Sequence, residues 1–139
     1  EQGRALAAET GADGVMIGRG VFGNPWVFSA AGAPDDLRAA VETMLAHALL
    51  YDLLFVGRKN FVDLRRHFKA YVGGFRGARR LRMELMETHS VGDVERIVTP
   101  VIGADSVRRA HDRAQELASA EAWASRRNGA VELTVKTAG

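Results

Sequence analysis

The chain has no cysteine among its 139 residues, so it can form neither a disulfide nor a thiolate metal site, and it offers no Cys nucleophile. Its four histidines lie at positions 47, 67, 89 and 111, too far apart for a local metal-binding motif. The G-x-S-x-G motif that presents a serine nucleophile is also missing. We therefore expect no metal site and no nucleophilic catalysis.

Long apolar runs are missing as well, because no stretch approaches the ~20 residues that a membrane-spanning helix needs. Residues 1–11, EQGRALAAETG, resemble the middle of a helix more than a signal peptide. The apolar content of 47% and the charged content of 26% are ordinary for a soluble globular protein. We expect the C-terminal portion of a longer, cytoplasmic protein with no membrane partner.

Glycine, in contrast, is concentrated next to one apolar run, in residues 11–28, GADGVMIGRGVFGNPWVF. Val15, Met16 and Ile17 predict a short strand buried on both faces, as in parallel sheets. The turn at residues 18–20 can present backbone N–H groups to an anion at the start of a following helix. A phosphate-binding loop is one interpretation, and a plain strand-to-helix turn is the other.

The same glycines, Gly18-x-Gly20-x-x-Gly23, match the dinucleotide-binding fingerprint of Rossmann domains. That fold requires a second strand that ends in an acidic residue about 20 residues further on. Residues 35–55 predict one long helix instead, and Pro25 shortens the helix after the turn. Because the motif is weak without its context, we reject a Rossmann domain.

The rest of the chain predicts a small helical bundle. Apolar periodicity predicts helices over residues 2–10, 35–55, 58–72 and 77–87, another that starts at Ser90 and a last one that starts at Asp105. Asp35 and Asp105 are the expected caps of their helices, and Ser90 with Asp93 predicts a capping box. The positions expected inside are Leu37, Val41, Met44, Leu45, Ala48, Leu49, Phe61, Leu64, Phe68, Tyr71, Ala78, Leu81, Leu85, Val94, Ile97, Val98, Val101, Val107, Ala110, Ala114, Leu117 and Ala118.

Two segments interrupt this helical pattern. Residues 29–34 are small or helix-breaking and indicate a boundary between two units. Residues 131–135 alternate apolar and polar side chains, which predicts either a strand without a partner or a frayed end.

Basic residues gather between positions 58 and 82, although the net charge of the whole chain is only +2. This segment contains nine cationic residues and a single acidic residue, Asp63, and such a block of positive charge favours a polyanionic partner. Because Arg outnumbers Lys 16 to 3, a solvated helix face in an arginine-rich chain is the alternative. His67 lies within the block, whereas His47, His89 and His111 are expected at the surface or in caps.

Residues 11–20, GADGVMIGRG, resemble the last strand and phosphate loop of FMN-dependent (β/α)8 barrels. The continuation GNPWVF at residues 23–28 narrows the resemblance to the tRNA-dihydrouridine synthases, and within them to the bacterial B-type subfamily. Residues 64–82, LRRHFKAYVGGFRGARRLR, resemble the RNA-binding helical domain of the same enzymes. The chain departs from the family pattern at Ala70, where an aromatic is common, and at Gly73, where a lysine often precedes the glycine.

The resemblance implies a mainly α fold class: the final βα unit of a flavin (β/α)8 TIM barrel over residues 1–32, followed by a helical-bundle tRNA-binding domain over residues 33–125 and a tail over residues 126–139. It also implies a flavin-dependent oxidoreductase that reduces uridines in tRNA to 5,6-dihydrouridine with FMN, which NADPH recharges. The cysteine that protonates the base in this family has no counterpart here. The chain alone is therefore expected to be inactive.

Site residues also follow from the resemblance. Gly18 and Arg19 match the positions that bind the FMN phosphate, through backbone N–H groups and a guanidinium. The residues expected to bind tRNA are Arg58, Lys59, Arg65, Arg66, His67, Lys69, Arg79 and Arg82. The alternatives are a non-catalytic helical RNA-binding module and another FMN TIM-barrel oxidoreductase that acts on a small molecule. The cationic helix pair disfavours the second alternative, because a small substrate needs no such surface.

Overall fold

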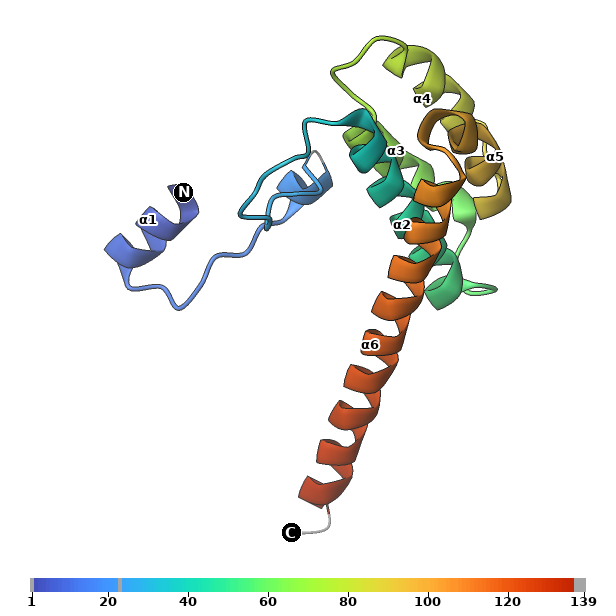
Figure 1. Ribbon diagram of the computed structural model, residues 1–139. Coiled ribbons are helices and arrows are strands. Elements are labelled where there is room, and N and C mark those ends of the chain that lie inside the picture. Colours follow the sequence, from blue (N-terminus) through green and yellow to red (C-terminus); the bar gives the residue numbers. More distant parts are fainter. Residues whose placement is uncertain (1, 23, 137–139) are drawn as a thin grey trace. The chain divides into compact units, whose positions relative to one another are not determined.

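The computed structural model describes the backbone of residues 2–22 and 24–136, and the side chains of residues 2–22, 24–120 and 122. The chain divides into two compact units, Glu1–Ala33 and Pro34–Gly139. Every regular element in the described part is helical, so the mainly α expectation is confirmed (Figure 1).

The first unit contains helix α1 (Gln2–Thr10) and the short 3-10 helix η1 (Arg19–Phe22). The predicted end of the first helix at Gly11 is confirmed. Gly11 has a φ of +71°, a backbone torsion that residues other than glycine rarely adopt. The hydroxyl of Thr10 donates to the Leu6 carbonyl at 2.8 Å and closes the last turn.

The strand predicted at residues 15–17 is wrong. These residues have no regular structure, and the side chains of Val15 and Met16 are 49% and 92% exposed. A strand of a parallel sheet is stabilised by hydrogen bonds and packing from its neighbours, and the described residues contain no strand to pair with it. The helix expected after this segment, shortened by Pro25, is the single 3-10 turn of η1.

The second unit is built around helix α2 (Leu37–Phe55), which packs against α5 and α6. The cap is Asp36 rather than the predicted Asp35, because the Asp36 carboxylate accepts hydrogen bonds from the N–H groups of Arg38 and Ala39 at 3.1 and 3.3 Å. Seven residues of α2 are buried, and the predicted ones among them are Val41, Met44, Leu45, Ala48 and Leu49. Leu37 is only partly buried.

The segment after α2 turns before it becomes helical again. Gly57 has a φ of +70° and follows the end of α2. The next helix starts later than residue 58, with η2 (Phe61–Leu64) leading into α3 (Arg65–Tyr71). The reason is local, because the Asn60 side chain accepts a hydrogen bond from the Val62 N–H at 3.1 Å and so caps η2. The predicted apolar stripe is confirmed, with Leu64 and Phe68 buried.

Helices α4 (Ala78–Met86) and α5 (Val91–Ile102) match their predicted positions. Gly77 precedes α4 with a φ of +90°, and the capping box of Ser90 and Asp93 starts α5. Residues buried as predicted are Ala78, Leu81, Leu85, Val94 and Val98. Val101 was expected inside but is 36% exposed, because residues 94, 98 and 102 form the buried stripe and residue 101 lies beside it.

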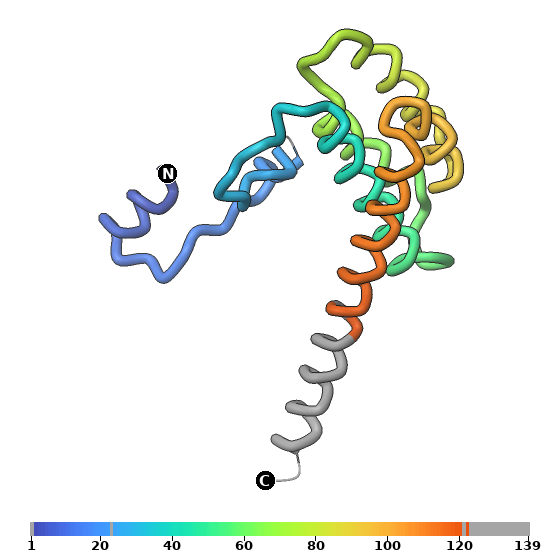
Figure 2. Tube along the Cα trace, viewed as in Figure 1, coloured from blue at the N-terminus to red at the C-terminus, as the bar shows by residue number. Residues whose placement is uncertain are grey.

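Helix α6 (Ala104–Lys136) follows directly, and Figure 2 traces the path of the described chain into it. The Val107 N–H donates to the Gly103 carbonyl at 3.2 Å, so α6 begins before Asp105, and Asp105 lies in its first turn rather than at the cap. Ala110 and Ala114 are buried as predicted, whereas Leu117 is 43% exposed.

The strand that alternation predicts at residues 131–135 is also wrong, since α6 extends to Lys136. A helix satisfies its own backbone hydrogen bonds, whereas a lone strand leaves them without partners. The rest of the predicted tail, residues 137–139, lies outside the described residues.

Candidate nucleic-acid interface and phosphate loop

The residues expected to bind RNA all lie in the second unit, on α3, α4 and the turn that precedes η2. Arg58 and Lys59 follow α2, and the Lys59 ammonium lies 4.3 Å from the centre of the Phe55 ring, a cation–π contact. Helices α3 and α4, which carry the other six, are in contact with each other. The exposed members of the set are Arg58, Lys59, Arg66, Lys69 and Arg79, and the half-buried ones are Arg65, His67 and Arg82.

The guanidinium of Arg65 is hydrogen-bonded to groups of the protein. Its Nε donates to the carbonyl of Thr88 at 2.6 Å, and its Nη2 lies 2.7 Å from Nδ1 of His89. Since a guanidinium can only donate, Nδ1 of His89 is the acceptor. Arg65 therefore links the start of α3 to the turn between α4 and α5.

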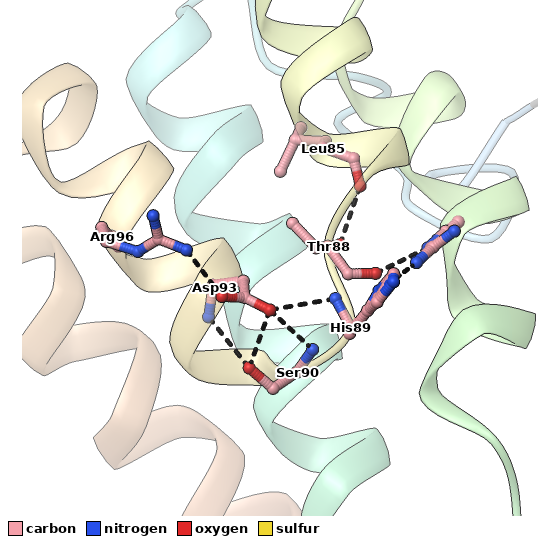
Figure 3. Close-up of polar contacts among 7 residues, drawn as sticks. Leu85, Thr88, His89, Ser90, Asp93 and Arg96 are labelled. Atoms are coloured by element: carbon pink, nitrogen blue, oxygen red, sulfur yellow. Dashed lines mark hydrogen bonds and ion pairs between the residues drawn. The ribbon is translucent and has the colours of Figure 1, made fainter.

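That turn is densely hydrogen-bonded, as Figure 3 shows. Thr88 is buried, and its hydroxyl donates to the Leu85 carbonyl at 2.7 Å. The Asp93 carboxylate accepts from the backbone N–H groups of His89 and Ser90 at 3.0 and 3.2 Å and from Arg96 at 2.6 Å. The His89 N–H, then Arg96 and Ser90, lower the pKa of Asp93 to about 2. Arg65 thus binds to a segment that several other hydrogen bonds also hold in place.

His67 is also partly turned toward the protein. Its ring packs edge-on against His47 with a centroid distance of 5.6 Å, and Nδ1 of His47 lies 3.0 Å from the hydroxyl of Tyr71. Burial, and then the Arg66 charge, lower the pKa of His67, while burial followed by the nearby His67 lowers the pKa of His47. Burial raises the pKa of Tyr71 to about 12. Both imidazoles are therefore biased toward the neutral form.

The surface position predicted for His47 is wrong, because this residue is half-buried in the middle of α2. A signal was present in the sequence, since His47 falls at helical spacing among the apolar residues Met44, Ala48 and Tyr51. His89 and His111 are exposed, as expected, and His89 lies at the cap of α5.

The candidate phosphate loop is in the first unit. The Gly18 carbonyl accepts from the Val21 N–H at 3.3 Å, while the N–H groups of residues 18–20 donate to no acceptor in the described chain. Arg19 is exposed. A Cβ added at Gly18 meets nothing within 4 Å, and its φ is ordinary, so the backbone itself does not require glycine there. Gly23 lies outside the described residues.

Other kinds of site have no support in the described chain. Residues 2–22, 24–120 and 122 contain no group of three or more His, Asp or Glu side chains that could hold a metal ion. Among the helices described, none is both long and apolar enough to cross a membrane.

Comparison with known proteins identifies the family. A family model described as "Dihydrouridine synthase (Dus)" matches residues 1–106, which is most of the chain. The chain belongs to the dihydrouridine synthase family. The resemblance inferred from residues 11–28 and 64–82 is therefore confirmed.

Bacterial relatives carry consistent names. A "Probable tRNA-dihydrouridine synthase" of Staphylococcus aureus (strain MRSA252) is 37% identical over 97 residues, which cover 69% of this chain and 30% of the relative. A protein of the same name from Staphylococcus epidermidis (strain RP62A) is 35% identical over 99 residues, with shares of 70% and 30%. The "Probable tRNA-dihydrouridine synthase 2" of Bacillus subtilis (strain 168) is 34% identical over 99 residues, with the same shares.

The chain thus spans about 30% of the length of these relatives. No solved structure matches it.

Proposed function

We propose that this chain is a C-terminal portion of a tRNA-dihydrouridine synthase, an oxidoreductase that reduces specific uridines of tRNA to 5,6-dihydrouridine with FMN and NADPH. The family match over residues 1–106 carries the proposal. Within that enzyme, the first unit contributes to the flavin-binding barrel, and the second unit binds tRNA.

The tRNA surface consists of the cations of α3, α4 and the preceding turn. Phosphates of a folded RNA are contacted mainly by Arg and Lys, and RNA helices are recognised through shape and backbone. The exposed cations Arg66, Lys69 and Arg79 fit this role. For Arg65 we propose a different role, because its contacts with Thr88 and His89 hold α3 against the turn before α5. It positions the surface rather than contacting phosphate.

The flavin phosphate is proposed to bind at Gly18 and Arg19. The donors fit an anion, because the N–H groups of residues 18–20 have no acceptor in the described chain and Arg19 is exposed. Open space at Gly18 leaves room for a phosphate close to the backbone. When bound, reduced FMN supplies the hydride for the uracil C5–C6 double bond. These residues only hold the cofactor, and the acid that protonates the base is proposed to lie elsewhere in the enzyme.

The main test is a titration of labelled tRNA with the full chain at several salt concentrations. We expect binding whose logarithm falls linearly with the logarithm of salt concentration, because cations displace condensed counterions from phosphates. The double variant Arg66→Ala/Lys69→Ala should lower that slope by roughly one for each lost phosphate contact. A matched control is Arg108→Ala/Arg113→Ala on α6, which removes the same charge elsewhere. Equal losses in both double variants would indicate only a general effect of charge.

The competing function is a non-catalytic RNA-binding module, which the separate compactness of the second unit favours. The two differ in whether the loop at Gly18 contributes to flavin binding. In the full-length enzyme, Gly18→Val should reduce the flavin content of the purified protein while tRNA affinity stays unchanged. An unchanged flavin content would contradict the phosphate-loop assignment.

A further inference from the structure

The outward face of α4 carries two exposed methionines that the basic motif does not explain. Met83 and Met86 are 63% and 42% exposed, and Met83 lies on the side of the helix opposite the buried stripe. A shallow hollow of about 510 Å³ lies over them. Its lining residues are Arg79, Arg82, Met83, Glu84, Met86 and Glu87.

The cations of α4 fall into two classes. Arg80 forms an ion pair with Glu84 at 2.9 Å along the helix. Arg79 and Arg82 pair with no carboxylate among the residues that the structure describes, and both line the same hollow as the methionines. The hollow therefore combines two uncompensated cations with an apolar floor, at the helical spacing 79, 82, 83 and 86.

A partner for this face must offer an anion and a flat apolar group a few ångströms apart. An unpaired nucleotide of a folded RNA has both, namely its phosphate and its base. Methionine suits the base, because its polarizable thioether packs well against aromatic rings. Arg79 lies in the first turn of α4, where the helix dipole also favours an anion.

We propose that the α4 face (Arg79, Arg82, Met83 and Met86) binds an unpaired nucleotide of the tRNA, with its phosphate on the two arginines and its base on the two methionines. The proposal rests on the tRNA binding proposed above and adds an apolar contact to it. Glu87, at the far end of the hollow from Arg79, then lies on the side of the base rather than of the phosphate.

Charge argues against the other occupants of such a face. A second copy of this chain, related by a two-fold axis, would bring Arg79 and Arg82 toward their own counterparts, and like charges oppose that contact. A purely apolar protein surface would remove the two guanidinium groups from water without a counter-charge.

The test compares two double variants and one single control variant of the full chain in tRNA titrations over a range of salt concentrations. Met83→Ala/Met86→Ala should weaken tRNA binding about five- to tenfold at every salt concentration, with an unchanged salt slope, because no phosphate contact is lost. Arg79→Ala/Arg82→Ala should weaken binding and lower the slope. The control Leu117→Ala removes a side chain with a similar exposure, 43%, from α6 and should change neither quantity.

A fully paired RNA duplex supplies the second arm, because it offers phosphates but no unpaired base. The methionine double variant should bind the duplex as the wild type does. Methionine oxidation gives an independent readout, since bound tRNA should protect Met83 and Met86 from peroxide while Met16, 92% exposed, continues to react.

Each other outcome overturns the proposal. If the methionine double variant keeps full tRNA affinity while the wild type binds, the nucleotide site fails and the proposed function stands. An equal loss on the duplex would show a general defect rather than base contact. Dimerisation of the wild type that this variant abolishes would assign the face to a second copy. If the wild type binds no tRNA, both proposals fail.

Discussion

The two units of the chain differ in whether their side chains form a core. No side chain is buried in residues 2–22 and 24–33, whereas the second unit buries Phe68 and Met44 almost completely. The family match nevertheless begins in the first unit and extends through α5 of the second. A segment can thus carry the sequence of its family without having a core of its own, because burial depends on the surface against which it packs.

The largest expected effect tests this difference directly. Phe68→Ala should lower the free energy of unfolding by about 3–5 kcal/mol, because it leaves a cavity in the core. Met16→Ala in the first unit should change it by less than about 0.5 kcal/mol, as is usual for exposed positions. Urea denaturation followed by circular dichroism measures both. A comparable loss in Met16→Ala would show that residues 15–17 are packed in solution.

A second comparison contrasts Arg65 with its neighbour Arg66 on α3. Arg65→Ala leaves the carbonyl of buried Thr88 without its donor, so we expect a loss of about 1.5–3 kcal/mol in unfolding free energy. Arg66→Ala should cost less stability than Arg65→Ala, because Arg66 is more exposed, and it should lower the salt slope of tRNA binding. If Arg65→Ala instead lowered the slope at constant stability, Arg65 would be a phosphate contact, as its sequence motif implies.

A third comparison uses one glycine from each unit. Gly77→Ala forces alanine into a φ of +90° before α4, which should cost about 1–2 kcal/mol of stability. Gly18→Ala should have almost no effect on stability, because the added methyl group meets nothing within 4 Å and the φ is ordinary. Thermal unfolding of the two variants beside the wild type gives the comparison. Destabilisation by Gly18→Ala would indicate contacts in the first unit that the structure lacks.

Within the second unit, the capping box of α5 makes a smaller contribution. Ser90→Ala removes the hydroxyl that accepts from the Asp93 N–H and should lower the free energy of unfolding by about 1 kcal/mol.

The pKa of Asp93 lies near 2, below its ordinary 3.8, so the stability from its ionised form is complete above pH 3.8 and is lost as the pH falls toward 2. Asp93→Asn should flatten this part of the pH–stability curve. An unchanged curve would exclude Asp93 as its source.

The smallest effect concerns His47 and His67. Burial holds the pKa of each below the ordinary 6.5, so the unfolded chain takes up protons first as the pH falls. Stability should therefore be complete above pH 6.5 and should decline as the pH drops through the interval below it. His47→Phe should reduce this decline, as measured by urea denaturation at several pH values. A steeper decline in the variant would mean that His47 is charged in the folded protein.

Much of the second unit could be predicted, because its signals are local. Apolar spacing located α2, α4 and α5, and the capping box was visible as Ser90 and Asp93 three residues apart. The cap of α2 was predicted at Asp35 and is Asp36, because either of two neighbouring aspartates can accept from the same N–H groups. The predictions failed at residues 15–17 and 131–135, where alternation or branching favours a strand but the described chain offers no neighbouring strand.

The candidate site could likewise be predicted from the sequence only in part. The sequence placed cations on two adjacent helices, but it contained nothing to show that Arg65 points inward. Likewise, the surface position predicted for His47 followed from its polar residue type, whereas its position in an apolar stripe indicates burial. Met83 and Met86 follow the basic segment, and nothing in the sequence indicates that these apolar side chains lie exposed.

The sequence by itself determined the family, the helix boundaries set by Gly57 and Gly77, and the region where cations gather. These properties depend on residues within a few positions of one another, through backbone torsions, caps and helical periodicity. Only the tertiary structure decided which of the cations remain available for a partner. Arg65 reaches groups 23 and 24 residues away in the chain, and such distant contacts exist only after α3 has packed near the turn between α4 and α5.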